Sequence, residues 1–126
     1  MTKVVKPQGG SVTAMPETIA ETVLNRTMSD QEYEALVHGF WPKDMEDRWL
    51  MYVDDEWVYL HRSWTGHCVF KARIEVHRNL HVLATLHINR DVSQYKSTNL
   101  EADIDEFNSV LNSLISKNLQ VVGLKS

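Results

Sequence analysis

The sequence predicts an α+β domain: a four-stranded antiparallel meander with a long C-terminal amphipathic helix on one face and two short N-terminal helices. Two patterns predict this fold. Between residues 48 and 90, β-branched and aromatic residues recur at a period of two, which indicates strands joined by short turns. From residue 100 to about residue 117, apolar residues recur at helical spacing. A chain of 126 residues suits one domain, which we assign to residues 16–126, after a flexible N-terminal arm over residues 1–15.

Two short helices are expected before the strands. Pro16 suits the first turn of a helix that runs to about Asn25. Ser29 is a good N-cap for the next helix, and Glu32, three residues later, completes a capping box. We expect both helices to pack on the sheet.

Strand parity predicts which side chains share a face, because a one-residue slip exchanges the two faces. We expect a two-residue turn at Asp54 and Asp55, and a three-residue turn over residues 77–79 in which Asn79 adopts the left-handed conformation. These turns assign the following residues to the core face: Trp49, Met51, Val58, Leu60, Cys68, Phe70, Ala72, Ile74, Val76, Leu80, Val82, Ala84, Leu86 and Ile88. The opposite face is nearly half apolar or aromatic, so we expect the N-terminal helices to cover it. Homodimerisation through this face is the second expectation.

The C-terminal helix has the widest apolar stripe in the chain. Its members are Leu100, Ile104, Phe107, Leu111 and Leu114. Thr98 or Asn99 is the expected N-cap, and the stripe predicts a helix that lies across one face of the sheet. Residues 119–124 are expected to add an edge strand.

Composition excludes several classes of function. A net charge of -4 and a pI near 5.8 argue against general nucleic-acid binding, which needs a clustered basic surface. The single cysteine, Cys68, allows no internal disulfide and no zinc pattern. Residues 1–13 hold no apolar run long enough for a signal peptide, and no stretch approaches a membrane span. We expect a cytoplasmic protein that binds neither nucleic acid nor membrane.

The first candidate motif joins the second helix to the first strand. Residues 41–49 hold two indoles and three carboxylates in nine positions. Glu46 or Asp47 could act as a general base or hold a ribose hydroxyl, while Trp41 or Trp49 stacks on a planar ring. In the structural alternative, the carboxylates pair with Arg62 and the indoles close the end of the core.

The second candidate motif, residues 61–66, combines Arg62, Ser63, Trp64, Thr65 and Gly66. A guanidinium, two hydroxyls and a glycine turn can bind phosphate through side chains and backbone N–H groups. The motif is neither a P-loop nor a dinucleotide fingerprint. In the structural alternative it is a tight hairpin turn whose hydroxyls satisfy the backbone, with Trp64 over the sheet edge.

Other reactive residues do not assemble into a site. His61, His81 and His87 share a predicted face, but no carboxylate lies at ligand spacing beside them, so we expect no metal site. Ser63 has no evident base, and Cys68 is expected to face inward. We therefore predict no catalytic residues and no cofactor.

Three runs carry a resemblance to a known family: Trp41-Pro42, Asp44-Met45-Glu46-Asp47-Arg48-Trp49 and His61-Arg62-Ser63-Trp64-Thr65-Gly66. They resemble a small bacterial family with a W-P-x-D-M-E-D-[K/R]-W and H-R-S-W-T-G signature. They are also similar to segments associated with macro and ADP-ribosylglycohydrolase domains, which handle ADP-ribose. The resemblance implies a link to ADP-ribose or NAD metabolism and carries over no catalytic residue.

Two functional hypotheses follow. The first is a small binding module for ADP-ribose or NAD-like nucleotides. Its expected ligand-binding residues are Glu46, Asp47, Trp49, Arg62, Ser63, Trp64, Thr65 and Gly66. The second is a protein-interaction or accessory domain that binds a partner or a second copy through the aromatic sheet face. An enzyme that uses Glu46 or Asp47 as base is the third and weakest alternative.

Overall fold

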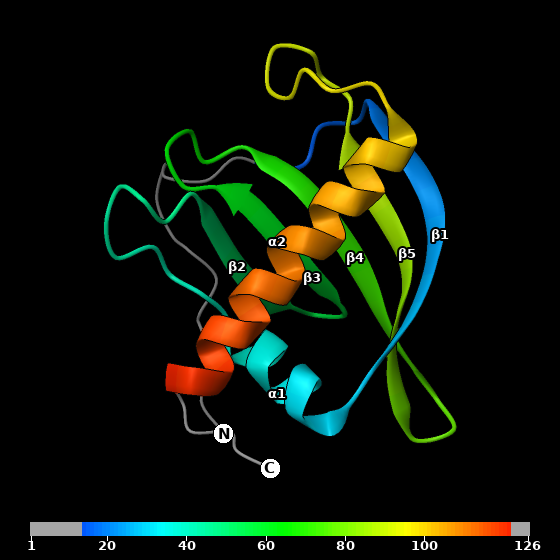
Figure 1. Ribbon diagram of the computed structural model, residues 1–126. Helices are drawn as coiled ribbons and strands as arrows, with labels where there is room; N and C mark the ends of the chain where they lie inside the picture. Colours follow the sequence, from blue (N-terminus) through cyan, green and yellow to red (C-terminus); the bar gives the residue numbers. More distant parts are fainter. Residues whose placement is uncertain (1–13, 122–126) are drawn as a thin grey trace.

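The computed structural model describes residues 14–121, which form a five-stranded antiparallel sheet and two helices (Figure 1). In chain order the elements are β1 (Ile19–Met28), α1 (Asp30–His38), β2 (Trp49–Asp54), β3 (Trp57–Arg62), β4 (Cys68–His77), β5 (Leu80–Asn89) and α2 (Leu100–Val121). The strand order is β1-β5-β4-β3-β2. The α+β class, the antiparallel sheet and the long C-terminal helix are confirmed, whereas the expected four strands and three helices are wrong. The expected N-terminal arm, residues 1–15, falls almost entirely outside the described residues.

The helix expected from Pro16 to about Asn25 is in fact a strand, β1. Residues at even positions along β1 are partly or fully buried, while most of those at odd positions, such as Val23, are exposed. This alternation has the period of a strand. Pairing with β5 decides the outcome, because β5 would otherwise leave a row of backbone N–H and C=O groups without partners.

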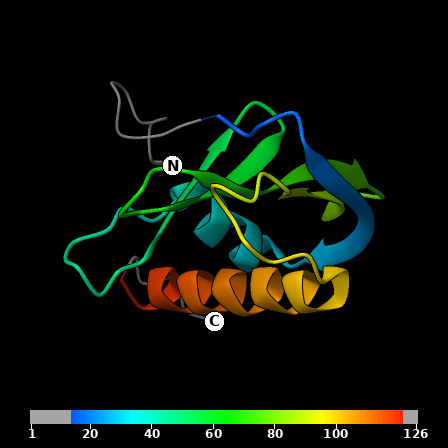
Figure 2. The ribbon, with the colours of Figure 1, turned by 90° about the horizontal axis from the view of Figure 1, so that it is seen from above.

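The second expected helix is confirmed as α1, with the capping box in place. The Ser29 Oγ accepts a hydrogen bond from the Glu32 backbone N–H at 3.1 Å, and the Glu32 Oε1 accepts one from the Ser29 N–H at 2.8 Å. The helix buries Ala35 and Leu36 in the same core as α2. Both helices therefore lie on one face of the sheet (Figure 2), and the expectation that N-terminal helices cover the opposite face is wrong.

The turns differ from the expected ones. In the first hairpin Asp54 pairs with Trp57, so the turn residues are Asp55 and Glu56. This shift moves the pairing by two residues and leaves the predicted faces unchanged. Asp55 has a φ of 60°, in the left-handed region that aspartate tolerates in turns.

The β4–β5 hairpin has a two-residue turn instead of the expected three-residue turn. Arg78 and Asn79 have φ values of 54° and 68°, which is the conformation of a type I′ turn. Arg73 pairs with Thr85, and the next residue of β4, Ile74, pairs with Leu83, so Ala84 of β5 has no partner on β4 and forms a β-bulge. This extra residue in the strand takes the place of the third turn residue that was expected.

The bulge divides the predicted core face into two parts. Away from the turn, Phe70 and Ile88 lie on the core face as predicted; they pair with each other, and both are fully buried. Beside the turn the assignment is wrong for β5: Leu80 is 46% exposed, while Leu83 enters the core. Val76 of β4 keeps the face of the buried Ile74 but is 62% exposed near the end of its strand. The bulge moves the residues of β5 between Ala84 and the turn to the other face and leaves the faces of β4 unchanged.

Helix α2 crosses the sheet diagonally (Figure 1), and its N-cap is Asn99, whose Oδ1 accepts a hydrogen bond from the Ala102 N–H at 2.9 Å. Phe107 is fully buried and meets Phe70 edge-on, with 5.6 Å between the ring centres. The helix continues to Val121, so the first part of the expected strand 119–124 is helical, and residues 122–124 lie outside the described range. Within the described range, neither helix is long and apolar enough to cross a membrane.

Candidate ligand-binding site

The two sequence motifs meet at one end of the sheet. We call residues 41–48, which lead into β2, the motif loop, and residues 63–67, which join β3 to β4, the motif turn. The Ser63 hydroxyl donates a hydrogen bond to the backbone C=O of Asp47 at 2.7 Å, and the Ser63 N–H donates one to the C=O of Arg48 at 2.9 Å. The Trp64 Nε1–H donates one to the C=O of Met45 at 3.1 Å. Three hydrogen bonds thus join the motifs into one unit.

Most polar groups of the motif turn are already hydrogen-bonded to other groups of the protein. Gly66 has a φ of 79°, and its N–H donates to the C=O of Arg62 at 2.7 Å. The C=O of Gly66 lies 2.9 Å from the His61 Nδ1, and the Thr65 Oγ1 accepts from the His67 N–H at 3.3 Å. The hydroxyls of Ser63 and Thr65 therefore support the backbone, as the structural alternative expects, and Gly66 offers no free N–H to a phosphate.

Arg62 is held by an aromatic ring and not by a carboxylate. Its guanidinium carbon lies 4.6 Å from the centre of the Trp49 indole. Trp49 is itself buried and stacks on Phe70, with 5.9 Å between ring centres. Within residues 14–121 the Arg62 guanidinium makes no ion pair, so the structural alternative of a pair with Glu46 or Asp47 is wrong.

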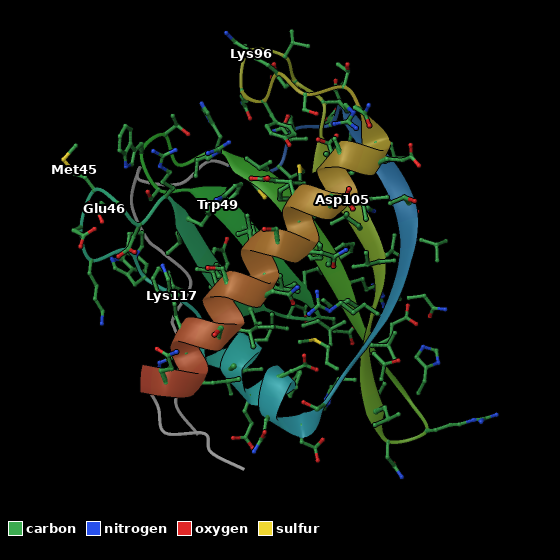
Figure 3. The ribbon with its side chains drawn as sticks, viewed as in Figure 1. Met45, Glu46, Trp49, Lys96, Asp105 and Lys117 are labelled. Carbon is green, nitrogen blue, oxygen red and sulfur yellow. The ribbon has the colours of Figure 1, made fainter. Side chains whose placement is uncertain are left out.

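The carboxylates of the motif loop have other roles. The Asp47 Oδ2 accepts from the Lys43 N–H at 3.0 Å, and its Oδ1 lies 3.6 Å from the Lys117 Nζ of α2. The Lys43 N–H, with help from the Lys117 ammonium, holds the pKa of Asp47 below its usual value. Glu46 projects outward from the loop beside Met45 (Figure 3). Glu46 and Asp47 line another hollow, of about 260 Å³, between the loop and α2, together with Arg48 and Trp49 but without Arg62 or Trp64.

A cleft of about 560 Å³ lies between the motif turn and the segment 94–97. We call it the basic cleft. Its lining residues are Arg48, Arg62, Trp64, Thr65, Gln94, Tyr95, Lys96 and Ser97. Three of them are cationic and none is a carboxylate, although the whole chain has a net charge of -4. In the part of the chain that the structure describes, no carboxylate pairs with Arg48, Arg62 or Lys96.

A buried carboxylate of α2 positions the segment that forms one wall of the basic cleft. Asp103 accepts hydrogen bonds from the Tyr95 hydroxyl at 2.8 Å and the Ser97 hydroxyl at 2.5 Å, and it lies 2.6 Å from a guanidinium nitrogen of Arg90. Burial, together with the hydrogen bond to Asp103, raises the pKa of Tyr95 to about 12, so its hydroxyl stays protonated and donates. The sequence interpretation missed this wall. The available signal was an acidic residue beside the apolar stripe of α2, four residues before Phe107.

A second hollow, of about 380 Å³, also borders Trp64. We call it the tryptophan cleft. Its lining residues are Trp41, Pro42, Lys43, Asp44, Met45, Leu50, Arg62, Ser63 and Trp64. It shares Arg62 and Trp64 with the basic cleft, so the two clefts adjoin. Trp41 is 50% exposed and Trp64 is 66% exposed.

Residues that could bind a metal or act as nucleophiles lie apart from each other. Among residues 14–121, no three His, Cys, Asp or Glu side chains are grouped as metal ligands would be. His61 lies 3.2 Å from the Tyr52 hydroxyl, His81 stacks on Tyr33, and His87 is on a different strand from His61. Burial raises the pKa of the Cys68 thiol to about 12, so the thiol is a poor nucleophile at neutral pH.

The chain matches no family model, no curated protein and no solved structure.

Proposed function

We propose that the protein is a small binding module for anionic, nucleotide-like compounds, and that the basic cleft holds the anionic group. The observation that carries the proposal is the charge of the lining: Arg48, Arg62 and Lys96 without a carboxylate, in a chain with a net charge of -4. Guanidinium and ammonium groups are the side chains that bind phosphate in proteins.

The position of Arg62 supports this proposal. Stacking on Trp49 fixes the guanidinium at 4.6 Å from the ring centre and leaves its edge N–H groups for a ligand. A fixed, half-buried guanidinium loses little conformational entropy when it binds a phosphate, so it adds more affinity than a mobile surface arginine.

ADP-ribose and NAD are the members of this class that the sequence resemblance favours. Tyr95 and Trp64 on the lining offer aromatic faces, and Gln94 offers an amide for hydrogen bonds. Glu46 and Asp47 are not part of this proposal, because they face another hollow.

The test is binding of ADP-ribose, NAD and AMP, measured by calorimetry and by thermal shift. A ligand present at a hundred times its Kd stabilises the fold by about 2.7 kcal/mol, which raises Tm by several degrees. Arg48→Gln should weaken binding about tenfold or more, because it removes a charge-assisted contact. Arg78→Gln is the matched control: it removes the same charge from the turn at the far end of β4. Absence of any shift in the wild-type protein at millimolar nucleotide, or equal binding by the two variants, would contradict the proposal.

Self-association through the outer face of the sheet is the second candidate. Both helices lie on the other face, and Trp57 and Tyr59 are partly exposed on the outer face. The Lys71 ammonium lies 4.4 Å from the centre of the Trp57 ring, which places a cation and two aromatic rings on one surface. A second copy would bury these rings. Light scattering over a wide range of protein concentrations decides this candidate, since a monomer at every concentration would exclude it.

A further inference from the structure

We infer that the tryptophan cleft receives the planar ring of the same ligand, so that the ligand spans both clefts and passes over Arg62 and Trp64. This inference rests on the proposed function, because the basic cleft must first hold the anionic group. It specifies the ligand class further: an anion joined to a flat, nitrogen-bearing ring, which a free phosphate or a phosphorylated sugar lacks.

The shared wall of the two clefts is the first observation. Arg62 and Trp64 line both of them. The Trp64 Nε1–H donates to the C=O of Met45 at 3.1 Å, so the indole is held at the boundary before any ligand arrives. A ligand whose anionic group contacts Arg62 in the basic cleft therefore lies next to the tryptophan cleft.

The exposure of two indoles is the second observation. Of all Phe, Tyr and Trp side chains between residues 14 and 121, Trp41 and Trp64 are the two that are exposed, and both line the tryptophan cleft. The other Phe, Tyr and Trp side chains of this range are buried or half-buried in the fold. Exposed indoles gathered at one hollow are a stacking platform, because any flat ring can lie on an aromatic face.

The difference in charge between the clefts is the third observation, and it indicates which end of the ligand binds in which cleft. Asp44 lines the tryptophan cleft, whereas no carboxylate lines the basic cleft. One oxygen of Asp44 accepts the Glu46 N–H at 2.9 Å, which leaves the second oxygen to accept an N–H or O–H from a ligand. Lys43 and Arg62 also line the tryptophan cleft, so its lining has two cations and one carboxylate, whereas the basic cleft has three cations and no carboxylate. The anionic end belongs in the basic cleft, and the donor-bearing ring belongs beside Asp44.

The test uses Trp41, which lines the tryptophan cleft but not the basic cleft. Within the described part of the chain, its side chain makes no hydrogen bond and no contact with another ring. Trp41→Ala should raise the Kd for ADP-ribose about tenfold or more, because a stacked base loses its platform. Trp41→Phe keeps an aromatic face and should restore most of the affinity. Ribose 5-phosphate, which carries the anionic group without a base, should bind the wild type and Trp41→Ala equally.

Three outcomes separate this inference from the proposed function. If Trp41→Ala binds ADP-ribose as the wild type does while Arg48→Gln binds it more weakly, the ring subsite is wrong and the proposed function stands. In a second outcome, Trp41→Ala weakens the binding of ADP-ribose and Trp41→Phe does not restore it, or Trp41→Ala weakens the binding of ribose 5-phosphate by the same factor. In either case Trp41 acts through the fold, and the inference is wrong. If the wild type binds neither compound, both the proposed function and the inference fail.

Discussion

Replacing Asp103 by asparagine should destabilise the protein by about 3 kcal/mol, because the change breaks a buried ion pair. The Asp103 side chain is 1% exposed and the side chain of its partner, Arg90, is 16% exposed. The asparagine side chain would keep an oxygen for the Tyr95 or Ser97 hydroxyl, but Arg90 would lose its counter-charge in a poorly solvated position. Loss of one member of a buried pair costs about 3 to 5 kcal/mol, and we expect the lower end since Arg90 retains some contact with water. Urea denaturation measures the effect as a lower midpoint with an unchanged m-value.

Asp105→Asn is the matched control for this prediction, because Asp105 lies two residues further along α2 and is exposed (Figure 3). It should change the free energy of unfolding by less than about 0.5 kcal/mol. A double-mutant cycle with Arg90→Met should show that the double variant loses less stability than the sum of the single variants. If Asp103→Asn is no more destabilising than Asp105→Asn, or the cycle shows no coupling, the reasoning is refuted. The pair would then not anchor the wall of the basic cleft.

Two further predictions concern the core and the response to pH. Phe107→Ala should cost about 3 to 5 kcal/mol, since it leaves a cavity beside Phe70; a urea-measured loss below about 0.5 kcal/mol would mean that α2 does not pack there. Burial lowers the pKa of His87 below 6.5, against the opposing effect of Glu21, so the unfolded chain binds this proton more tightly than the folded one. His87 should therefore contribute stability above pH 6.5 that is lost as the pH falls through its lowered folded-state pKa. His87→Gln should flatten that decline in urea melts, and parallel declines for wild type and variant would contradict the assignment.

The fold was predictable where local pattern and tertiary packing agree. The capping box at Ser29 and the stripe around Phe107 are local signals, and both elements form as predicted. The segment that becomes β1 has a thin apolar stripe that fits a helix, but its alternation also fits a strand. Its state depends on the free edge of β5, which lies about sixty residues away in the chain.

The site was predictable in part. The sequence motifs meet as a unit, through hydrogen bonds from Ser63 and Trp64 to the motif loop. The partner of Arg62 was not predictable, because its guanidinium stacks on Trp49 while Asp47 turns to Lys117. Which of several nearby carboxylates and rings an arginine contacts depends on angles between loops, and a sequence pattern does not contain those angles.

The sequence by itself determined the class of the fold, the helix start at Ser29, the alternating faces away from the bulges and the two motifs that build one end of the sheet. These features depend on neighbours a few residues apart, whose spacing the sequence states directly. The tertiary structure alone decided that β1 is a strand, that Ala84 forms a bulge and that Asp103 anchors the wall of the basic cleft. The pairing of β1 depends on β5, which is distant in the chain, whereas the bulge and the Asp103 contacts depend on how neighbouring segments meet in space. In each case the free energy of the tertiary contact outweighs a weak local preference.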